Sequence, residues 1–370
     1  MNRGMNRRGF LAAAGLTAAG AALATTTTGK ARAAAGAFRV PVEDTRHTRT
    51  WMAWPDSTAI WPGKLSGVQA DISLIARTIA TYEPVVMCAN PGSAAKARSM
   101  CGSSVTVISS IPVDDCWMRD TGPVFRTDGA GGLDAVGLNF NGWGNKQTHA
   151  KDALVAERIA AWVGVPFTSA DLVGEGGAIE QDGAGTLMAT RSSLVNGNRN
   201  PGMSESRLAA AMCEAYGASK VIWFDGVYGQ DITDDHVDAT SRFLAPGEAL
   251  VQMPLSSDTD AYARDARRQY SVLSASTTAT GRAMDVMRLQ GPDYDKIRST
   301  NRNFLASYAN FYLCNGAVIS AHFGDTRADE AARATLARLY PDRVIEQLNI
   351  DRLGTGGGGI HCVTQQQPAA

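Results

Sequence analysis

The sequence predicts an α/β fold in one large domain, and three observations lead to this prediction. Short apolar, strand-like runs alternate with longer stretches of helical periodicity along residues 38–370. No low-complexity linker divides that range, which argues for a single domain. No GxGxxG turn follows the first predicted strand and no Walker A motif occurs, so a nucleotide-binding doubly wound sheet is disfavoured.

The predicted elements follow one another in a mixed order. Apolar runs rich in branched residues predict strands at residues 83–89, 104–110, 220–225, 249–253, 285–289, 317–322 and 343–348. Helical spacing of apolar residues predicts helices at residues 70–81, 150–163, 204–216, 258–274 and 328–339. Asp325 or Thr326 is placed to cap the last of these helices. The groups recur without a fixed period, so the residues alone establish no repeat.

Composition and charge exclude some classes of function. The chain has 370 residues, of which 44% are hydrophobic and 19% are charged, and its formal net charge is -1. These values are ordinary for a globular protein with a large core. Without a basic patch or a recognisable nucleic-acid-binding module, we expect no nucleic acid partner.

The N-terminal residues have the pattern of a targeting segment. Arg7 and Arg8 form a twin-arginine pair, a weakly apolar run follows at residues 11–24, and small residues follow at Ala31 and Ala33. We therefore expect residues 1–37 to be a twin-arginine signal peptide, residues 38–370 to be a single catalytic domain, and the protein to be exported. An uncleaved membrane anchor is the alternative, but the run is short for a spanning helix of about 20 residues.

The six cysteines do not suggest a disulfide framework. An even number in an exported protein invites disulfides, but these cysteines are scattered and form neither a CxxC pair nor a zinc pattern. Cys88 and Cys314 lie in apolar runs and are predicted core thiols. Because the twin-arginine route exports folded proteins, a reduced catalytic cysteine is compatible with export.

The C-terminal segment offers the clearest candidate for a catalytic group. Four glycines at residues 356–359 lead into an apolar run that contains Cys362. Consecutive glycines are entropically costly to order, so they suit a backbone that approaches another group closely or takes positive φ. A thiol directly after such a run can reach a substrate, which makes Cys362 the predicted nucleophile. Gly359 is a predicted substrate-binding residue.

Three polar strings supply candidate partners for this thiol. Residues 114–123 place several aspartates, including Asp120, in a turn-prone segment, and Glu175 precedes a pair of glycines. His236 is followed two residues later by Asp238, and at strand spacing the two side chains face the same side. His236 is therefore the predicted partner of Cys362. His361 is disfavoured because neighbouring residues on a strand point to opposite faces.

Each of these strings also has a structural explanation. Aspartate-rich turns are usually solvated or cap helices, and a histidine is often only hydrogen-bonded. A calcium site at residues 231–235 is a further alternative, although the string lacks the glycine and the final glutamate of an EF-hand loop. A metal site built on Asp120, Glu175, His236 and Asp238 also stays open.

The types of residue favour one reaction class. An ester or amide passes through an anionic intermediate, which carboxylates around a thiol would repel. A planar guanidinium instead binds carboxylates in bidentate pairs. Its central carbon is open to attack by a thiolate, and its charge stabilises that thiolate. The residues therefore favour hydrolysis of a C–N bond in a guanidinium.

At these residues the chain closely resembles the agmatine deiminase family, a branch of the guanidino-group-modifying enzymes that also includes bacterial peptidyl-arginine deiminases. The resemblance runs from residues 38–41 to residues 365–368, which is essentially the whole predicted mature chain. The matching strings lie at residues 50–55, 117–123, 175–177, 198–201, 236–238, 306–312 and 357–362. Chance does not produce so many matches in this order.

The resemblance implies the pentein fold, an α/β-propeller with pseudo-fivefold ββαβ-type repeats around a central active site. It implies Cys362 as the nucleophile and His236 as the general acid and base. Asp120 and Asp238 would clamp the guanidinium nitrogens, and Glu175 would assist His236 or the substrate. No metal or cofactor is implied, the substrate would be a small cationic guanidine, and a homo-oligomer is compatible with the sequence.

The implied reaction converts agmatine and water to N-carbamoylputrescine and ammonia through a thiouronium intermediate, with Trp117 lining the pocket. One departure concerns the substrate's tail. Agmatine-specific members tend to read Asp-Thr-Asn-Gly-His over residues 232–236, and the first acid can meet the distal amine. Ile232 stands at that position here and cannot pair with an ammonium. A peptidyl-arginine or free-arginine deiminase is therefore the alternative, followed by an amidinotransferase and a non-catalytic guanidine-binding protein.

Overall fold

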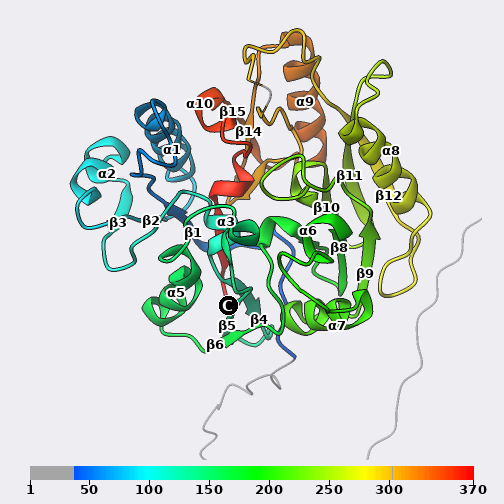
Figure 1. Cartoon of the computed structure of the whole chain (residues 1–370), viewed down its shortest axis with the longest axis horizontal. Coiled ribbons are helices and arrows are strands. Elements are labelled where there is room, and N and C mark those ends of the chain that lie inside the picture. Colours follow the sequence, from blue (N-terminus) through cyan, green and yellow to red (C-terminus); the bar gives the residue numbers. More distant parts are fainter. Residues whose placement is uncertain (1–36, 302) are drawn as a thin grey trace, which may run out of the picture. The chain divides into compact units, whose positions relative to one another are not determined.

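A computed structural model describes residues 37–301 and 303–370, and their fold is α/β, as the sequence predicts (Figure 1). The predicted signal peptide lies outside these residues except for residue 37. In the part of the chain that the structure describes, no helix has the length and apolarity needed to cross a membrane.

The strands belong to small separate sheets. They are β1 (His47–Ala53), β2 (Val85–Cys88), β3 (Val105–Ile108), β4 (Val124–Thr127), β5 (Leu133–Gly137), β6 (Phe167–Ser169), β7 (Ile179–Gln181), β8 (Thr186–Thr190), β9 (Lys220–Phe224), β10 (Ser241–Ala245), β11 (Glu248–Met253), β12 (Asp285–Gln290), β13 (Tyr312–Cys314), β14 (Ala317–Ala321), β15 (Val344–Leu348) and β16 (Gln365–Pro368). Within the described residues they form sheets in the orders β16-β1-β2-β3, β4-β5-β6, β7-β8-β9, β10-β11-β12 and β13-β14-β15.

The longer helices connect parallel strands, and the short helices lie in the segments between strands. They are α1 (Leu65–Ile79), α2 (Ala94–Cys101), α3 (Met118–Thr121), α4 (Gly142–Asn145), α5 (Val155–Val163), α6 (Arg191–Leu194), α7 (Glu205–Tyr216), α8 (Ala261–Ser274), α9 (Thr326–Leu339) and α10 (Asp351–Gly354). Short 3₁₀ turns are η1 (Asp152–Leu154), η2 (Gly176–Ala178), η3 (Val237–Ala239) and η4 (His361–Val363).

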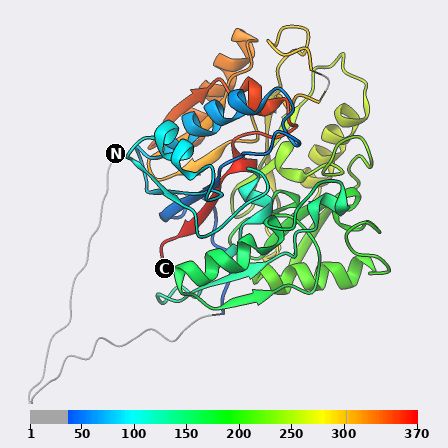
Figure 2. The ribbon, with the colours of Figure 1, turned by 60° about the vertical axis from the view of Figure 1, so that its left-hand side comes forward.

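One pairing pattern recurs through the sheets. In each three-stranded sheet the first two strands are antiparallel and the second and third are parallel. A helix lies between the two parallel strands, because parallel neighbours need a long crossover connection. The four-stranded sheet follows the same scheme, since C-terminal β16 pairs antiparallel with β1 (Figure 2). The two ends of the described chain are thus joined in one sheet.

Most predicted elements are confirmed, with shifted ends. The predicted strands correspond to β2, β3, β9, β11, β12, β14 and β15, and the predicted helices to α1, α5, α7, α8 and α9. Asp325 caps α9, because its carboxylate accepts a hydrogen bond from the Ala328 N–H. Helix α8 begins at Ala261 because Asp260 caps it in the same way. The remaining strands, among them β16, lie outside the predicted elements.

The largest apolar cluster extends from the core to the candidate site. It contains Trp54, Tyr312 and many branched residues from the sheets of β1 and β13, and it also contains Trp117 and Ile360. Dense packing of this kind holds side chains in single conformations. The segments that carry Trp117 and Cys362 are therefore fixed by the core itself.

Candidate active site

The predicted site residues come together on four short turns. Asp120 belongs to α3, Glu175 precedes η2, His236 and Asp238 lie at the start of η3, and Cys362 lies in η4. Turn α3 contacts both η2 and η4, and η2 contacts η3. Segments far apart in the sequence thus place these side chains in one region.

Gly177 lies at the centre of this region. A Cβ at Gly177 would lie 2.7 Å from His236 Nδ1, 3.0 Å from Asp120 Oδ1 and 3.1 Å from Asp238 Oδ2. Its backbone N–H donates to Asp120 Oδ1 at 3.0 Å. The missing side chain therefore leaves the space in which three functional groups meet.

His236 is held by carboxylates and is buried. Its Nε2 lies 3.3 Å from Glu175 Oε2, and its Nδ1 lies 3.8 Å from Asp120 Oδ1. Burial by itself lowers the pKa of His236, but the Asp120 charge and the hydrogen bond to Glu175 outweigh it and raise the pKa to about 9. His236 is thus protonated at neutral pH and able to donate a proton.

The chain ahead of His236 turns sharply to place it. Asp234 and Asp235 both have positive φ, at 62° and 73°, a conformation that short polar side chains tolerate better than most. The Asp234 carboxylate is fixed by Lys146 and Arg199, each at 2.7 Å. This anchored carboxylate fixes the turn.

Arg199 is a site residue to which the sequence analysis gave no role. Its Nε contacts Glu175 Oε1 at 2.9 Å, while another of its nitrogens contacts Asp234. Both Arg199 and Glu175 are buried. Arg199 therefore orients the carboxylate that faces His236. The only signal was the family-like string at residues 198–201.

The Cys362 thiol lies against Asn310 and Asp238. Asn310 Nδ2 is 3.3 Å from Sγ, and Asp238 Oδ2 is 3.8 Å from it. Asn310 Oδ1 accepts from the His361 backbone N–H at 3.1 Å and also lies 3.4 Å from Sγ, so the whole Asn310 amide faces the sulfur. Within the described residues His236 forms no hydrogen bond with Sγ. The role of His236 as the partner of Cys362 in the reaction stays a prediction.

The Cys362 thiol is difficult to ionise in this structure. Burial, followed by the charges of Asp238 and Asp120, raises the pKa of the thiol well above its ordinary value. A cation placed among these groups would have the opposite effect. It would lower the pKa of the thiol and favour the thiolate.

Asp120 and Asp238 differ in their hydrogen-bond partners and in the direction of their pKa shifts. Asp120 accepts from the Trp143 indole at 2.9 Å, and burial raises its pKa against the opposing charge of His236. Burial would also raise the pKa of Asp238, but its hydrogen bond to His361 lowers it. Among the described residues, Asp238 Oδ1 is buried without a hydrogen-bond partner.

The predicted pocket residues have structural contacts that sequence reasoning missed. Trp117 donates its indole N–H to Asp115, and a Cβ at Gly358 would collide with its ring, whereas a Cβ at Gly356 would collide with the ring of Trp61. A Cβ at Gly359 would lie 2.4 Å from Asn310 Oδ1. These glycines thus let the backbone approach protein side chains closely, as a run of glycines predicts, and substrate binding by Gly359 stays a prediction.

Ile232 is half-buried against the largest apolar cluster. Its backbone carbonyl accepts a hydrogen bond from Lys146 Nζ at 3.0 Å. The segment therefore presents an apolar side chain beside a cation, and the next acidic residue, Asp234, is already paired with Lys146 and Arg199.

Two sequence-based geometric arguments are wrong. His361 and Cys362 lie in the 3₁₀ turn η4, and His236 caps the 3₁₀ turn η3 that contains Asp238, so neither pair follows strand spacing. His236 and Asp238 still meet, because both approach Gly177. His361, which was disfavoured as a strand neighbour of Cys362, bonds to Asp238 at 2.7 Å.

The acidic groups that could hold a metal are not those considered from the sequence. In residues 37–301 and 303–370, the group with ligand atoms close enough together is Glu43, Glu180 and His361. Arg242 contacts Glu43 at 2.8 Å and Glu180 at 2.7 Å. A guanidinium already balances these two carboxylates.

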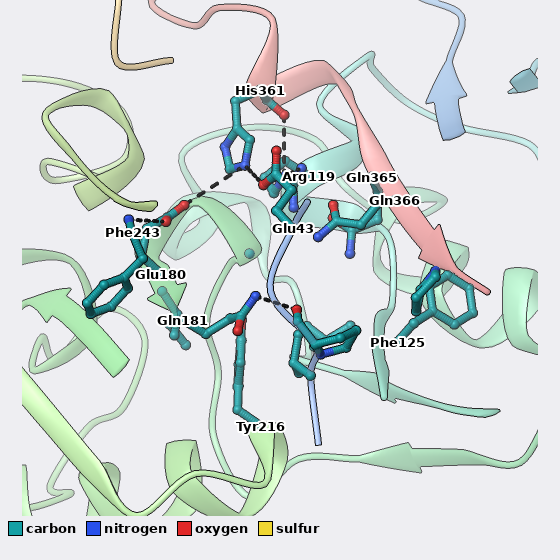
Figure 3. Close-up of a pocket in the computed structure, with 16 residues that line it drawn as sticks. Glu43, Arg119, Phe125, Glu180, Gln181, Tyr216, Phe243, His361, Gln365 and Gln366 are labelled. Carbon is teal, nitrogen blue, oxygen red and sulfur yellow. Dashed lines mark hydrogen bonds and ion pairs between the residues drawn. The ribbon is translucent and has the colours of Figure 1, made fainter. Parts of the chain in front are cut away.

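This second acidic group borders a separate pocket (Figure 3). The pocket is lined by Glu43, Arg119, Glu180, His361 and further residues, but by none of Cys362, His236 and Asp120. His361 thus has one side toward Asp238 and the other toward this pocket.

Comparison with known proteins agrees with the chemistry of the site. The profile of the family described as Porphyromonas-type peptidyl-arginine deiminase matches residues 39–368. A provisionally named agmatine deiminase of Streptomyces coelicolor is 39% identical over 343 residues, covering 90% of this chain and 99% of that protein. Agmatine deiminase of Pseudomonas aeruginosa is 34% identical over 357 residues, covering 90% of this chain and 96% of that protein.

A solved structure is similar over the same range. Agmatine deiminase of Enterococcus faecalis superposes with a TM-score of 0.84 at 28% sequence identity, covering 90% of this chain and 96% of that chain.

Proposed function

The chain belongs to the Porphyromonas-type peptidyl-arginine deiminase family, and we propose that it hydrolyses the guanidinium group of agmatine to give N-carbamoylputrescine and ammonia. As a member of this family it is a hydrolase of guanidino C–N bonds. The agmatine assignment is supported by relatives that carry this activity in their names.

One observation carries the proposal. Three buried carboxylates, from Asp120, Glu175 and Asp238, converge on the region of the half-buried Cys362 thiol. Buried carboxylates around a thiol disfavour an anionic substrate, whereas a flat guanidinium offers N–H donors to an oxygen such as Asp238 Oδ1, which has no hydrogen-bond partner among the described residues. The site is therefore complementary to a planar cation.

The proposed reaction has two stages. The guanidinium lies between Asp120 and Asp238, and its charge stabilises the Cys362 thiolate. The sulfur attacks the central carbon, His236 donates a proton to one nitrogen, and ammonia leaves. Water then attacks the resulting thiouronium while His236 accepts a proton. The C–S bond breaks, the ureido product forms, and the thiolate is restored.

A second candidate substrate has its own support. Ile232 offers no acid for the distal amine of agmatine, and the neighbouring cation is Lys146. A cation suits the carboxylate of arginine better than an ammonium. A free-arginine or peptidyl-arginine deiminase, which would produce citrulline, is therefore the alternative.

Two wider features are part of the proposal. The recurring strand pattern supports a pentein propeller, in which the sheets surround the site, and the β1–β16 pairing would close the ring. The twin-arginine pattern in residues 1–37 supports export of the protein.

Ammonia release tests these assignments. The purified protein is assayed with agmatine, free arginine and a peptide that ends in arginine, each with and without an added amine acceptor. Release from agmatine without an acceptor supports the proposal. Activity only on the peptide or on arginine would replace the agmatine assignment, and dependence on the acceptor would indicate an amidinotransferase.

A further inference from the structure

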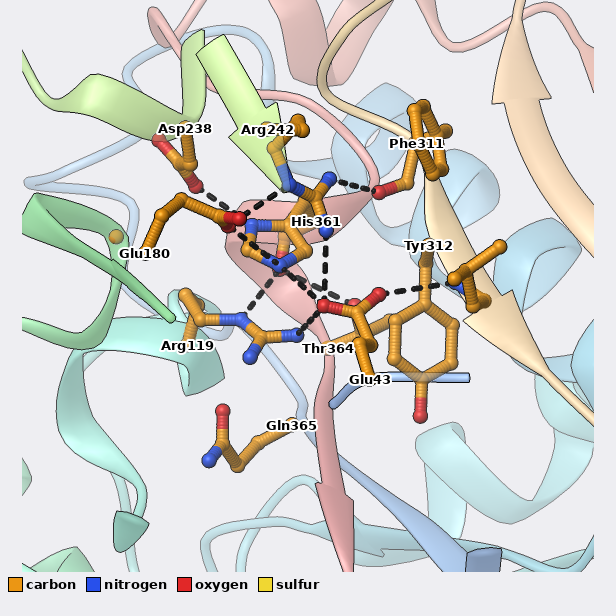
Figure 4. A network of polar contacts seen from close by, with 12 residues as sticks. Glu43, Arg119, Glu180, Asp238, Arg242, Phe311, Tyr312, His361, Thr364 and Gln365 are labelled. Carbon is orange, nitrogen blue, oxygen red and sulfur yellow. Dashed lines mark hydrogen bonds and ion pairs between the residues drawn. The ribbon is translucent and has the colours of Figure 1, made fainter. Parts of the chain in front are cut away.

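His361 lies between two carboxylates, one at each ring nitrogen (Figure 4). Its Nδ1 is 2.7 Å from Asp238 Oδ2, and its Nε2 is 3.0 Å from Glu43 Oε2. The His361 side chain is 2% exposed, and that of Asp238 is 1% exposed. Because a buried carboxylate must be hydrogen-bonded, the contact with Asp238 is a constraint on both side chains.

One carboxylate oxygen of Asp238 is hydrogen-bonded in this contact, and the other is not. Oδ2 accepts from His361, while Oδ1 is buried and has no partner among the described residues. A carboxylate held by one oxygen cannot rotate freely. The bond to His361 therefore determines where Oδ1 points, and Asp238 Oδ2 also lies 3.8 Å from Cys362 Sγ.

The other side of the imidazole is anchored by a rigid network. Glu43 is held by Arg242 at 2.8 Å and by the Leu313 backbone N–H at 3.0 Å. Arg242 in turn contacts Glu180 at 2.7 Å and the Phe311 carbonyl at 2.6 Å. The network thus fixes the position of the His361 ring, and the ring in turn fixes Asp238.

We propose that His361 is a positioning residue for the reaction: it holds Asp238 Oδ2 through Nδ1, so that Asp238 Oδ1 meets the substrate's guanidinium. The inference rests on the proposed function. It assigns His361 no contact with the substrate and no part in proton transfer to it.

Two substitutions separate the two ring nitrogens. His361→Asn places an amide N–H near the former Nδ1 and keeps the donor to Asp238. His361→Gln places its amide near the former Nε2 and keeps the contact with Glu43 instead. We expect kcat/KM to fall by about 10- to 100-fold in the Gln variant, the effect of losing a hydrogen bond to a charged group, mainly through a higher KM. The Asn variant should retain clearly more activity.

The controls separate this inference from the proposed function. His322, whose side chain contacts Arg298, receives the same two substitutions, and neither should change kcat/KM. If the wild-type protein releases no ammonia from any guanidine, the proposed function fails. If the wild-type protein is active but the two His361 variants are equally active or equally impaired, the positioning role is refuted.

If the Gln variant does not fold, the inference can still be tested by measuring substrate binding to the Asn variant. Calorimetry of the accepted guanidine is performed in a Cys362→Ser background, with and without His361→Asn. Retained binding in the Asn variant supports the role, because the donor to Asp238 is kept. Loss of binding in a folded Asn variant overturns it.

Discussion

The two buried histidines of the site differ in how many guanidinium groups accompany the carboxylates around them. His236 faces Asp120 and Glu175. Arg199 contacts the oxygen of Glu175 that does not face His236. His361 faces Asp238, Glu43 and Glu180, and two guanidinium groups, from Arg119 and Arg242, accompany these carboxylates (Figure 4).

The pKa shifts follow this difference. Burial raises the pKa of Asp120 despite His236, so the charge on Asp120 is unfavourable as it stands. The pKa of Glu43 stays well below its usual value, because Arg242 and then His361 outweigh its burial. The charge on Asp120 would therefore be stabilised by a further cation, which a substrate can supply, whereas the carboxylates around His361 are already balanced by guanidinium groups.

The largest effect is expected in the balanced network. Arg242→Met removes the cation between Glu43 and Glu180 and leaves both carboxylates buried without it. We expect the free energy of unfolding to fall by about 3–5 kcal/mol, the usual cost of breaking a buried ion pair. Urea unfolding measures this loss. An unchanged midpoint would show that Arg242 does not balance the network.

Among the carboxylates around His236, a substitution should lower kcat without lowering the melting temperature. Asp120→Asn removes a charge that the guanidinium requires but that burial disfavours. We expect kcat to fall by about 10²–10³, as for other lost electrostatic contacts in active sites. The melting temperature should be unchanged or higher. An Asn variant within threefold of wild-type activity would exclude Asp120 as a clamp, on the scale of that estimate.

The pH dependence of stability gives a smaller effect. The pKa of His236 is about 9 in the folded protein, above about 6.5 in the unfolded chain. The imidazolium thus stabilises the fold fully below about pH 6.5, and this contribution is lost as the pH rises through 9. The difference in unfolding free energy between wild type and His236→Asn should shrink by about 3 kcal/mol from about pH 6 to about pH 10. A difference that does not change with pH would contradict the raised pKa.

The smallest effect concerns the substrate's tail. The Lys146 side chain is 32% exposed, so its charge acts through solvent. If Lys146 favours a carboxylate-bearing tail, Lys146→Gln should lower the ratio of kcat/KM for arginine to that for agmatine by up to about fivefold. The ratio is measured by ammonia release from both compounds. A ratio that rises would show that Lys146 does not attract the carboxylate.

Sequence reasoning predicted the elements that have strong apolar patterns. The runs that became β2 and β14 are fully buried, so their composition alone marks them as strands. Strand β16 has the sequence Gln-Gln-Gln-Pro and pairs with β1, a contact that no local pattern announces. Such pairing depends on tertiary context rather than on propensity.

The residue types of the site were also readable, but their geometry was not. Cys362 and His236 stood out in unusual strings, whereas Arg199 and Asn310 act through contacts that arise only on folding. Gly177 could be read as a flexible residue, but not as the point where three side chains meet. His361 was disfavoured because a 3₁₀ turn was taken for a strand.

The most direct test of the central claim is the Cys362→Ser variant. Ammonia release and the heat of binding of the same guanidine are measured on this variant and on the wild-type protein. A thiol nucleophile in an acidic site predicts that binding is retained and that kcat falls by at least about 10⁴, as for loss of a nucleophile in other enzymes. Turnover within tenfold of wild type would contradict covalent attack by Cys362, given that scale.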